Sequence, residues 1–149
     1  GGVREMPPAP AEGEETDPAV EEARAAFEKG KVAYQTANYI DAADHFQSSF
    51  EASDGIQDEE LKAQVQSSLY YNMGQAQLAA YDLDQDRARL ARAKALLQNH
   101  LDSDPSLSEE ERAAALALID EAQGKLDALD AAADEAGGEG APGDETPAE

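Results

Sequence analysis

The chain has 149 residues, the size of a single domain, and its 33 acidic and 11 basic residues give a formal net charge of −22. So acidic a surface repels phosphate backbones and anionic lipid headgroups, and we therefore expect no nucleic-acid partner and no simple binding to membrane surfaces. No apolar run approaches the ~18 residues that span a bilayer, so we also expect no direct membrane insertion.

The chain contains no cysteine, so disulfide bonds give no indication of its compartment. It begins with glycine rather than methionine, as expected of a processed or trimmed chain. This slightly favours an exported or periplasmic location in a bacterium, and a cytoplasmic location stays open.

Both ends of the chain are expected to be disordered. Residues 1–16 are rich in proline and glutamate and offer only Val3 and Met6 as large apolar side chains. Residues 131–149 consist mainly of alanine, acidic residues, glycine and proline. Neither segment buries enough surface to offset the entropy of ordering. Residues 17–130 are therefore predicted to fold, between a disordered leader and a disordered acidic tail.

Composition and apolar periodicity within residues 17–130 predict an all-α fold. Asp17 is a typical cap residue and precedes a proline, so the first helix is expected over residues 18–36. Tyr39 begins a second apolar stripe, which stops before residues 53–55. Because the link between these two helices is so short, they are predicted to pack as an antiparallel pair.

Three further helices follow. Asp58 is expected to cap the third, and the fourth begins within residues 84–87 and ends before Pro105. The fifth opens with a capping box, in which the Ser108 hydroxyl accepts from the Glu111 amide and the Glu111 carboxylate accepts from the Ser108 amide.

The two helix pairs carry a similar pattern of small and large residues. Gly30 in the first pair corresponds to Gly74 in the second. Tyr39, Ala42, Phe46 and Ser49 correspond to Leu90, Ala93, Leu97 and His100. The small residues let the helices of a pair approach closely, and Phe46 or Leu97 fills the space against the next helix. The second pair is longer by about two helical turns, because the distance from its glycine to its alanine is seven residues greater.

This pattern resembles the tetratricopeptide repeat (TPR). The resemblance implies antiparallel helix pairs that form two TPR-like repeats, with the fifth helix as a C-terminal cap, together a fragment of an α-solenoid. In that family, partners commonly lie in a concave groove lined by the first helix of each pair. Carried over position by position, the groove consists of Arg24, Phe27, Lys31, Tyr34, Tyr71, Gln75 and Leu78, with Gln35 and Ser68 beside them.

We therefore expect a non-enzymatic interaction or scaffold module that binds another protein or a peptide and uses no cofactor and no metal. The aromatic residues of the groove would anchor the partner. Alternatively, they pack against one another or under the leader. Because two repeats are few for such a stack, the apolar edge around Val20 and Phe27 is expected to be covered by a second copy, another subunit or a further domain.

A second hypothesis is a calcium-responsive acidic protein. Asp82, Asp84 and Asp86 alternate as the first ligands of a calcium loop do, but Arg87 and Ala93 stand where that loop needs glycine and glutamate. An acidic connection that caps the next helix is the alternative.

Other charged and nucleophilic residues give weaker signals. His45 and His100 are the only histidines, and no set of nucleophile, base and orienting residue is recognisable, so we predict no enzyme. The basic cluster of residues 87–94 is expected to form internal ion pairs, with docking of an acidic partner as the alternative.

Overall fold

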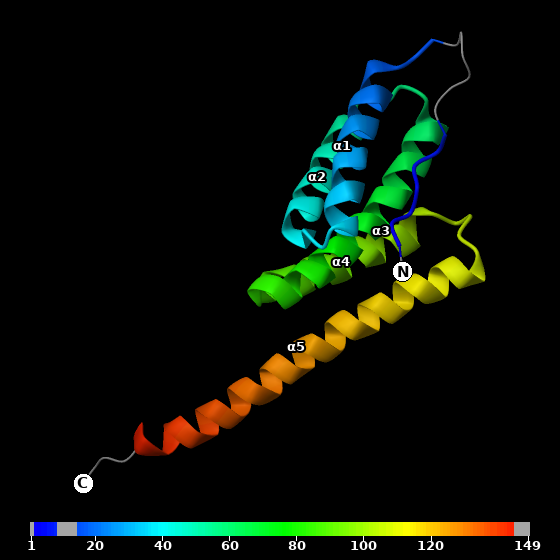
Figure 1. Cartoon of the computed structure of the whole chain (residues 1–149). Coiled ribbons are helices and arrows are strands. Elements are labelled where there is room, and N and C mark those ends of the chain that lie inside the picture. Colours follow the sequence, from blue (N-terminus) through cyan, green and yellow to red (C-terminus); the bar gives the residue numbers. More distant parts are fainter. Residues whose placement is uncertain (1, 9–14, 145–149) are drawn as a thin grey trace.

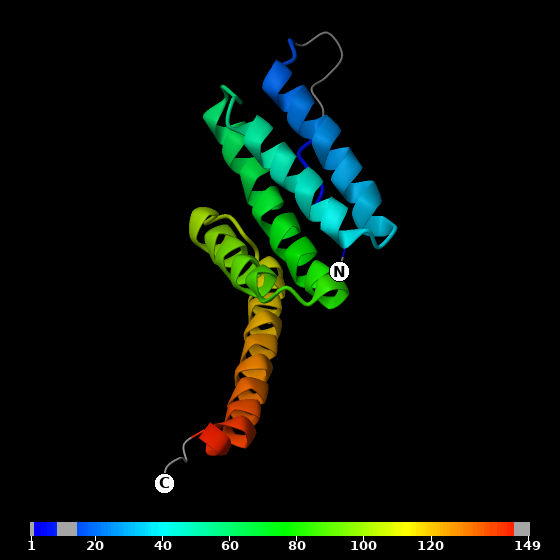
Figure 2. The same ribbon diagram turned by 90° about the vertical axis from the view of Figure 1, so that its left-hand side faces the viewer.

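The computed structural model describes residues 2–8 and 15–144, and the side chains only as far as residue 136. Within these residues the fold is all-helical, which confirms the predicted class. The helices are α1 (Pro18–Gln35), α2 (Tyr39–Ser53), α3 (Glu59–Asp84), α4 (Arg87–Ser103) and α5 (Glu109–Asp144). Each helix packs against the next, and α5 also touches α3 (Figure 1). In Figure 2, α1, α2 and α3 lie side by side, and α5 projects away from them.

The predicted caps set the starts of the helices. The Asp17 carboxylate accepts from the Ala19 amide, and the carboxylates of Asp58 and Asp86 act in the same way for α3 and α4. At the start of α5, Ser108 and Glu111 exchange two hydrogen bonds of 3.0 Å, as the capping box predicted. These helix starts are therefore fixed by contacts between near neighbours in the sequence.

Glycine lets the helices of both pairs approach closely. A Cβ atom at Gly30 would lie 2.6 Å from the Phe46 ring, and one at Gly74 would lie 2.7 Å from Leu97. Phe46 and Leu97 are fully buried. The two matching positions noted in the sequence therefore make matching contacts in space.

A hydrogen bond also recurs between the helices of each pair. The Ser49 hydroxyl donates to the Ala23 carbonyl at 2.7 Å, joining α2 to α1. At the corresponding place, His100 Nδ1 lies 2.9 Å from the Ser67 carbonyl and joins α4 to α3. The greater spacing in the second pair is accommodated by helix length, since α3 has 26 residues and α1 has 18.

The two chain ends differ from the expected disorder. Residues 2–8 have no regular secondary structure but pack against the helices, and Met6 is only 6% exposed. At the other end, α5 continues past residue 131 to Asp144. Residues 131–136 are four alanines and two acids, and alanine favours helix even where nothing packs against it. Residues 1, 9–14 and 145–149 of the expected disordered ends lie outside the described residues.

Candidate functional site

The N-terminal segment, residues 2–8, lies along the face formed by α1 and α3 (Figure 1). Glu5 contacts Lys31, and Pro7 contacts Arg24, so the segment runs antiparallel to α1. The face at which a partner was expected therefore already holds a stretch of the same chain. Five side chains make polar or ring contacts with this stretch and are called the segment-binding face below: Arg24, Lys31, Tyr71, Asn72 and His100.

Asn72 binds the main chain of the segment. Its Oδ1 accepts from the Arg4 amide at 2.7 Å, and its Nδ2 donates to the Arg4 carbonyl at 2.8 Å. The side chain is 1% exposed, so these bonds satisfy an amide that is buried in α3. Both contacts are made to main-chain atoms, and they therefore do not depend on which side chain the bound residue carries.

The Arg4 side chain enters a site formed by α3 and α4. Its guanidinium carbon lies 3.7 Å from the centre of the Tyr71 ring, and Nη1 lies 3.0 Å from His100 Nε2. His100 Nδ1 faces the Ser67 carbonyl, which only accepts, so Nδ1 carries the proton and Nε2 is free to accept from Arg4. Burial, followed by the charge of Arg4, lowers the pKa of His100, in agreement with this neutral ring.

Met6 is the apolar anchor of the segment. It belongs to one buried cluster with Val20, Phe27 and Val65, which are 4%, 1% and 1% exposed. The apolar edge at Val20 and Phe27 is thus covered within the chain. The sequence predicted an uncovered edge here, because the leader was expected to be too polar to pack. Burial of Val20 and Phe27 with Met6 removes that basis for expecting a second copy, another subunit or a further domain at this edge.

Two outer contacts complete the hold on the segment. Lys31 Nζ lies 2.8 Å from the Glu5 carboxylate, and this hydrogen bond is the main reason why the pKa of Lys31 is raised. The Glu5 side chain is 61% exposed, so solvent screens the pair and its contribution is small. Arg24 Nη2 donates to the Pro7 carbonyl at 2.8 Å.

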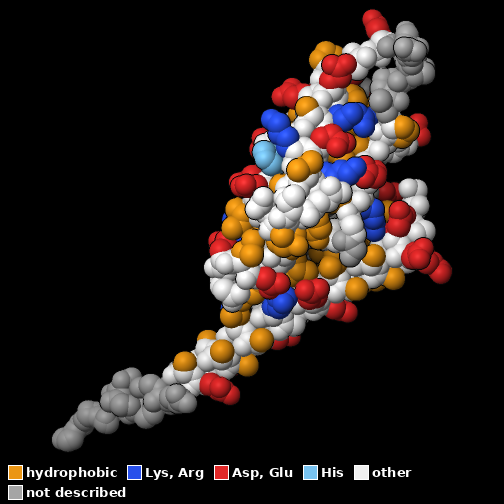
Figure 3. Space-filling model, viewed as in Figure 1, with side chains coloured by type: hydrophobic (Ala, Val, Ile, Leu, Met, Phe, Trp, Pro, Cys, Tyr) orange, Lys and Arg blue, Asp and Glu red, His pale blue; other side chains and the backbone are white. Residues whose placement is uncertain are grey.

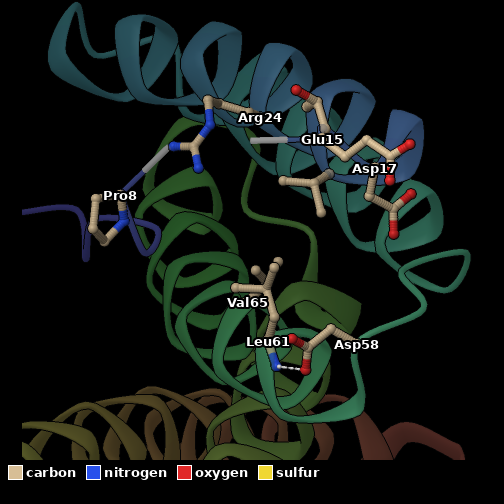
Figure 4. A pocket seen from close by; sticks show the side chains of 9 residues that line it. Pro8, Glu15, Asp17, Arg24, Asp58, Leu61 and Val65 are labelled. Carbon is tan, nitrogen blue, oxygen red and sulfur yellow. Dashed lines mark hydrogen bonds between the residues drawn. The ribbon is translucent and has the colours of Figure 1, made fainter. Parts of the chain in front are cut away.

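Two hollows border the segment. One, of about 360 Å³, lies beyond Pro8 between the starts of α1 and α3, and Figure 4 shows the Arg24 guanidinium directed toward Pro8 at its wall. Its apolar lining comes from Val20, Leu61 and Val65. The other, of about 190 Å³, lies beside Arg4. Figure 3 shows this side of the molecule, where hydrophobic side chains gather in the middle, above α5, with charged groups around them.

Three of the seven predicted partner-binding residues, Arg24, Lys31 and Tyr71, contact the segment. Phe27 lies in the buried apolar cluster that Met6 joins. It is 1% exposed, and its ring centre lies 5.9 Å from that of Phe46, so it is part of the core between α1 and α2. A helical stripe of apolar residues does not show which of its members lie at the edge of the core.

The other three predicted residues are Tyr34, Leu78 and Gln75. Tyr34 is half-buried with its ring edge-on to Tyr39, 5.0 Å between centres. Leu78 is 3% exposed and packs in a cluster to which α5 contributes Ala122. Gln75 is buried in α3. Phe27, Gln75 and Leu78 are thus largely covered in the folded chain.

Arg4 and Asn72 were not predicted from the sequence. The signal for Asn72 was present, because it is a polar residue between Tyr71 and Met73 in the most buried part of α3. A buried amide needs partners, and a polar residue in such a place indicates either a structural bond or a binding role. Arg4 lies in a segment that gives no local sign of structure.

Ser67, His100 and Asp104 lie close together but are not arranged as a catalytic triad. The Ser67 hydroxyl donates directly to Asp104 Oδ2 at 2.5 Å, whereas in a triad the imidazole lies between the hydroxyl and the carboxylate. Nε2 of His100, which would take the hydroxyl proton, faces Arg4 instead. Burial by itself would raise the pKa of Asp104, but hydrogen bonds from Ser106 and Ser67 hold it below its usual value. This network fixes the histidine ring.

The three aspartates of the calcium hypothesis are each used separately. Asp82 faces Lys125 at 3.5 Å, Asp84 pairs with Arg89 at 2.9 Å, and Asp86 caps α4. Among the described residues, no group of three or more His, Cys, Asp or Glu side chains is placed to hold a metal ion. The calcium hypothesis therefore receives no support from this geometry.

The basic cluster of residues 87–94 makes contacts within the chain. Arg87 pairs with Asp130 at 2.8 Å, Arg89 pairs with Asp84, and Lys94 hydrogen-bonds Gln123. Arg87 and Lys94 thereby join α4 to α5, which agrees with the expected internal pairing.

In the part of the chain that the structure describes, no helix is long and apolar enough to cross a membrane. Comparison with known proteins yields no match, whether to a family model, a curated protein or a solved structure. Function is therefore inferred from the segment-binding face itself.

Proposed function

We propose that this chain is a non-enzymatic interaction module that binds an extended stretch of another protein along the segment-binding face. The observation that supports this most directly is the pair of hydrogen bonds between Asn72 and the main chain of Arg4. A buried amide that binds both main-chain polar groups of one residue is suited to an extended peptide of many sequences.

The proposal includes the TPR-like arrangement, with α1–α2 and α3–α4 as two repeats and α5 as the cap. The contact of Gly30 with Phe46 and that of Gly74 with Leu97 support it, because the same close approach recurs at corresponding positions. In the family that the sequence resembles, the first helices of the pairs line the face for partners, and here α1 and α3 hold the segment.

Charge limits the class of partner. The net charge of −22 repels nucleic acids and favours protein segments that are neutral or basic. The face itself presents Arg24 and Lys31 to main-chain and acidic groups, and Tyr71 and the neutral His100 to a cation.

Selection from a displayed library of random peptides tests the proposal, with the full chain as bait. Asn72→Ala and Arg24→Ala remove two contacts of the face, and Asn99→Ala and Arg92→Ala are matched controls at exposed positions of α4. We expect selected peptides to bind the wild type and both controls alike, and to lose about ten-fold or more in affinity on Asn72→Ala. Peptides that bind all five chains equally would place the interface elsewhere.

A further inference from the structure

The N-terminal segment shows what chemistry the face selects, and this extends the proposed function, on which it rests. We infer that the ligand is an extended segment with an arginine, one variable residue, then methionine or a similar unbranched apolar residue, then proline. We also infer that residues 4–7 of this chain occupy the site in place of that ligand.

The arginine position is the most selective. One planar group stacks on the Tyr71 ring and at the same time donates to His100 Nε2. A guanidinium meets both demands, because it is flat and carries several donors in fixed directions, whereas a lysine ammonium is a compact point charge. Tyr71 and His100 are 5% and 1% exposed, so the bound guanidinium replaces solvent against buried rings.

The methionine position selects for apolar volume. Met6 is 6% exposed in the cluster that contains Phe27 and Val65, and a polar side chain there would lose its solvation. Between these two anchors, Glu5 is largely exposed and meets only Lys31, which leaves this position variable. The residue after Met6 needs only its carbonyl, which accepts from Arg24, and proline suits it because it favours an extended backbone and has no amide to satisfy.

The segment is tied to α1 through residues 9–16, so it competes with any ligand as an intramolecular group. An intramolecular group joined through so few residues has an effective concentration on the order of millimolar. A ligand with the same contacts therefore binds weakly while the segment is in place. Substitutions that weaken binding of the segment raise the fraction of free sites, and the apparent affinity of the ligand rises in proportion to that fraction.

The experiment uses a fluorescein-labelled synthetic peptide with the sequence of residues 2–8, measured by fluorescence anisotropy on full-length chains. The wild type is compared with the double variant Arg4→Ala/Met6→Ala. We expect the peptide to bind the double variant about ten-fold or more tightly than the wild type. Adding Asn72→Ala to the double variant should abolish the gain, and adding Asn99→Ala should not.

Peptide variants then test the selectivity. In the double-variant chain, an Arg4→Lys or a Met6→Ser peptide should bind about ten-fold or more weakly, and a Glu5→Gln peptide should stay within about three-fold. Equal binding of all four peptides would overturn the inferred order of residues. Failure of the leader peptide to bind either chain would overturn it as well.

A folding defect in the double variant does not block the test. If circular dichroism shows loss of helix in the double variant, the single variant Arg4→Gln, which keeps Met6 in its cluster, replaces it.

In the wild type, excess peptide should also raise the hydrogen-exchange rate of the Arg4 amide, and an unchanged rate would count against displacement. Library ligands that need Asn72 but lack this residue order would refute the inference and leave the proposed function standing. If no library peptide and no leader peptide binds, both fail.

Discussion

Arg4 and Asn72, 68 positions apart in the sequence, are joined by two hydrogen bonds of 2.7 and 2.8 Å between the main chain of the first and the side-chain amide of the second. Because the Asn72 side chain is buried, its amide would lie without these partners if the N-terminal segment left. The segment is therefore coupled to the stability of α3 as well as to the occupancy of the site.

Asn72→Ala should lower the free energy of unfolding by about 1–3 kcal/mol, because it removes two partly buried hydrogen bonds. Urea unfolding followed by circular dichroism measures this. Asn99→Ala, at an exposed position of α4, should change the value by less than about 0.5 kcal/mol. Equal effects of the two substitutions would show that the bonds between Asn72 and the N-terminal segment add nothing to the stability of the chain.

Gly30→Ala and Gly74→Ala should each destabilise the chain by about 1–3 kcal/mol, because the new methyl groups would lie 2.6 Å from Phe46 and 2.7 Å from Leu97. Alanine favours helix over glycine by about 1 kcal/mol, which offsets part of this cost. The shift in urea midpoint is the measurement.

Gly124→Ala provides a control of opposite sign, since nothing lies within 4 Å of the added Cβ atom in α5. It should stabilise the chain by up to about 1 kcal/mol through helix propensity.

Phe46→Leu should partly rescue Gly30→Ala, because it removes the ring that the methyl group meets. Destabilisation by Gly30→Ala that Phe46→Leu does not relieve would argue against the steric explanation.

Stability should fall as the pH drops below about 6.5, the usual pKa of histidine, because burial and then the charge of Arg4 lower the pKa of His100. Above that pH the ring is neutral in both the folded and the unfolded chain. Below it, the unfolded chain takes up a proton that the folded chain still excludes. The loss of stability therefore continues until the folded pKa is reached and then stops.

Melting temperatures between about pH 7.5 and pH 5.5 test this. His100→Gln keeps a neutral side chain beside Arg4 and should flatten the curve relative to the wild type, while His45→Gln, which keeps His100, should follow the wild type. If His100→Gln and the wild type lose the same number of degrees over this range, His100 is not the group responsible. The carboxylates of Asp84 and Asp104, whose pKa values are lowered, act in a separate window below about pH 3.8.

Calcium at millimolar concentration should leave the melting temperature unchanged. Asp82, Asp84 and Asp86 are engaged with Lys125, Arg89 and the start of α4, so the three carboxylates do not converge on one ion. Differential scanning fluorimetry with and without a chelator decides the question. A calcium-dependent rise would revive the calcium hypothesis, because an ion that binds only the folded chain must stabilise it.

Local chemistry made the helices predictable. Asp17, Asp58 and the Ser108–Glu111 capping box act on amides two or three residues away, so the sequence alone places those helix starts. The match of Gly30 to Gly74 was also visible, because close helix contact requires a small residue at a fixed position. The continuation of α5 beyond residue 131 was missed, since the lack of large apolar residues outweighed the alanine-rich composition in the prediction.

By itself the sequence determined the helical class, the caps and the repeated pair of small and large residues, because each depends on neighbours along one helix or on a fixed spacing. Only the tertiary structure decided which side chains form the site. Arg24, Phe27 and Lys31 share one stripe of α1, yet Phe27 is in the core, and Arg24 and Lys31 hold the N-terminal segment. That division depends on where α2, α3 and residues 2–8 lie in space. Met6 and Arg4 gain their contacts from residues distant in the chain, and no local pattern records such contacts.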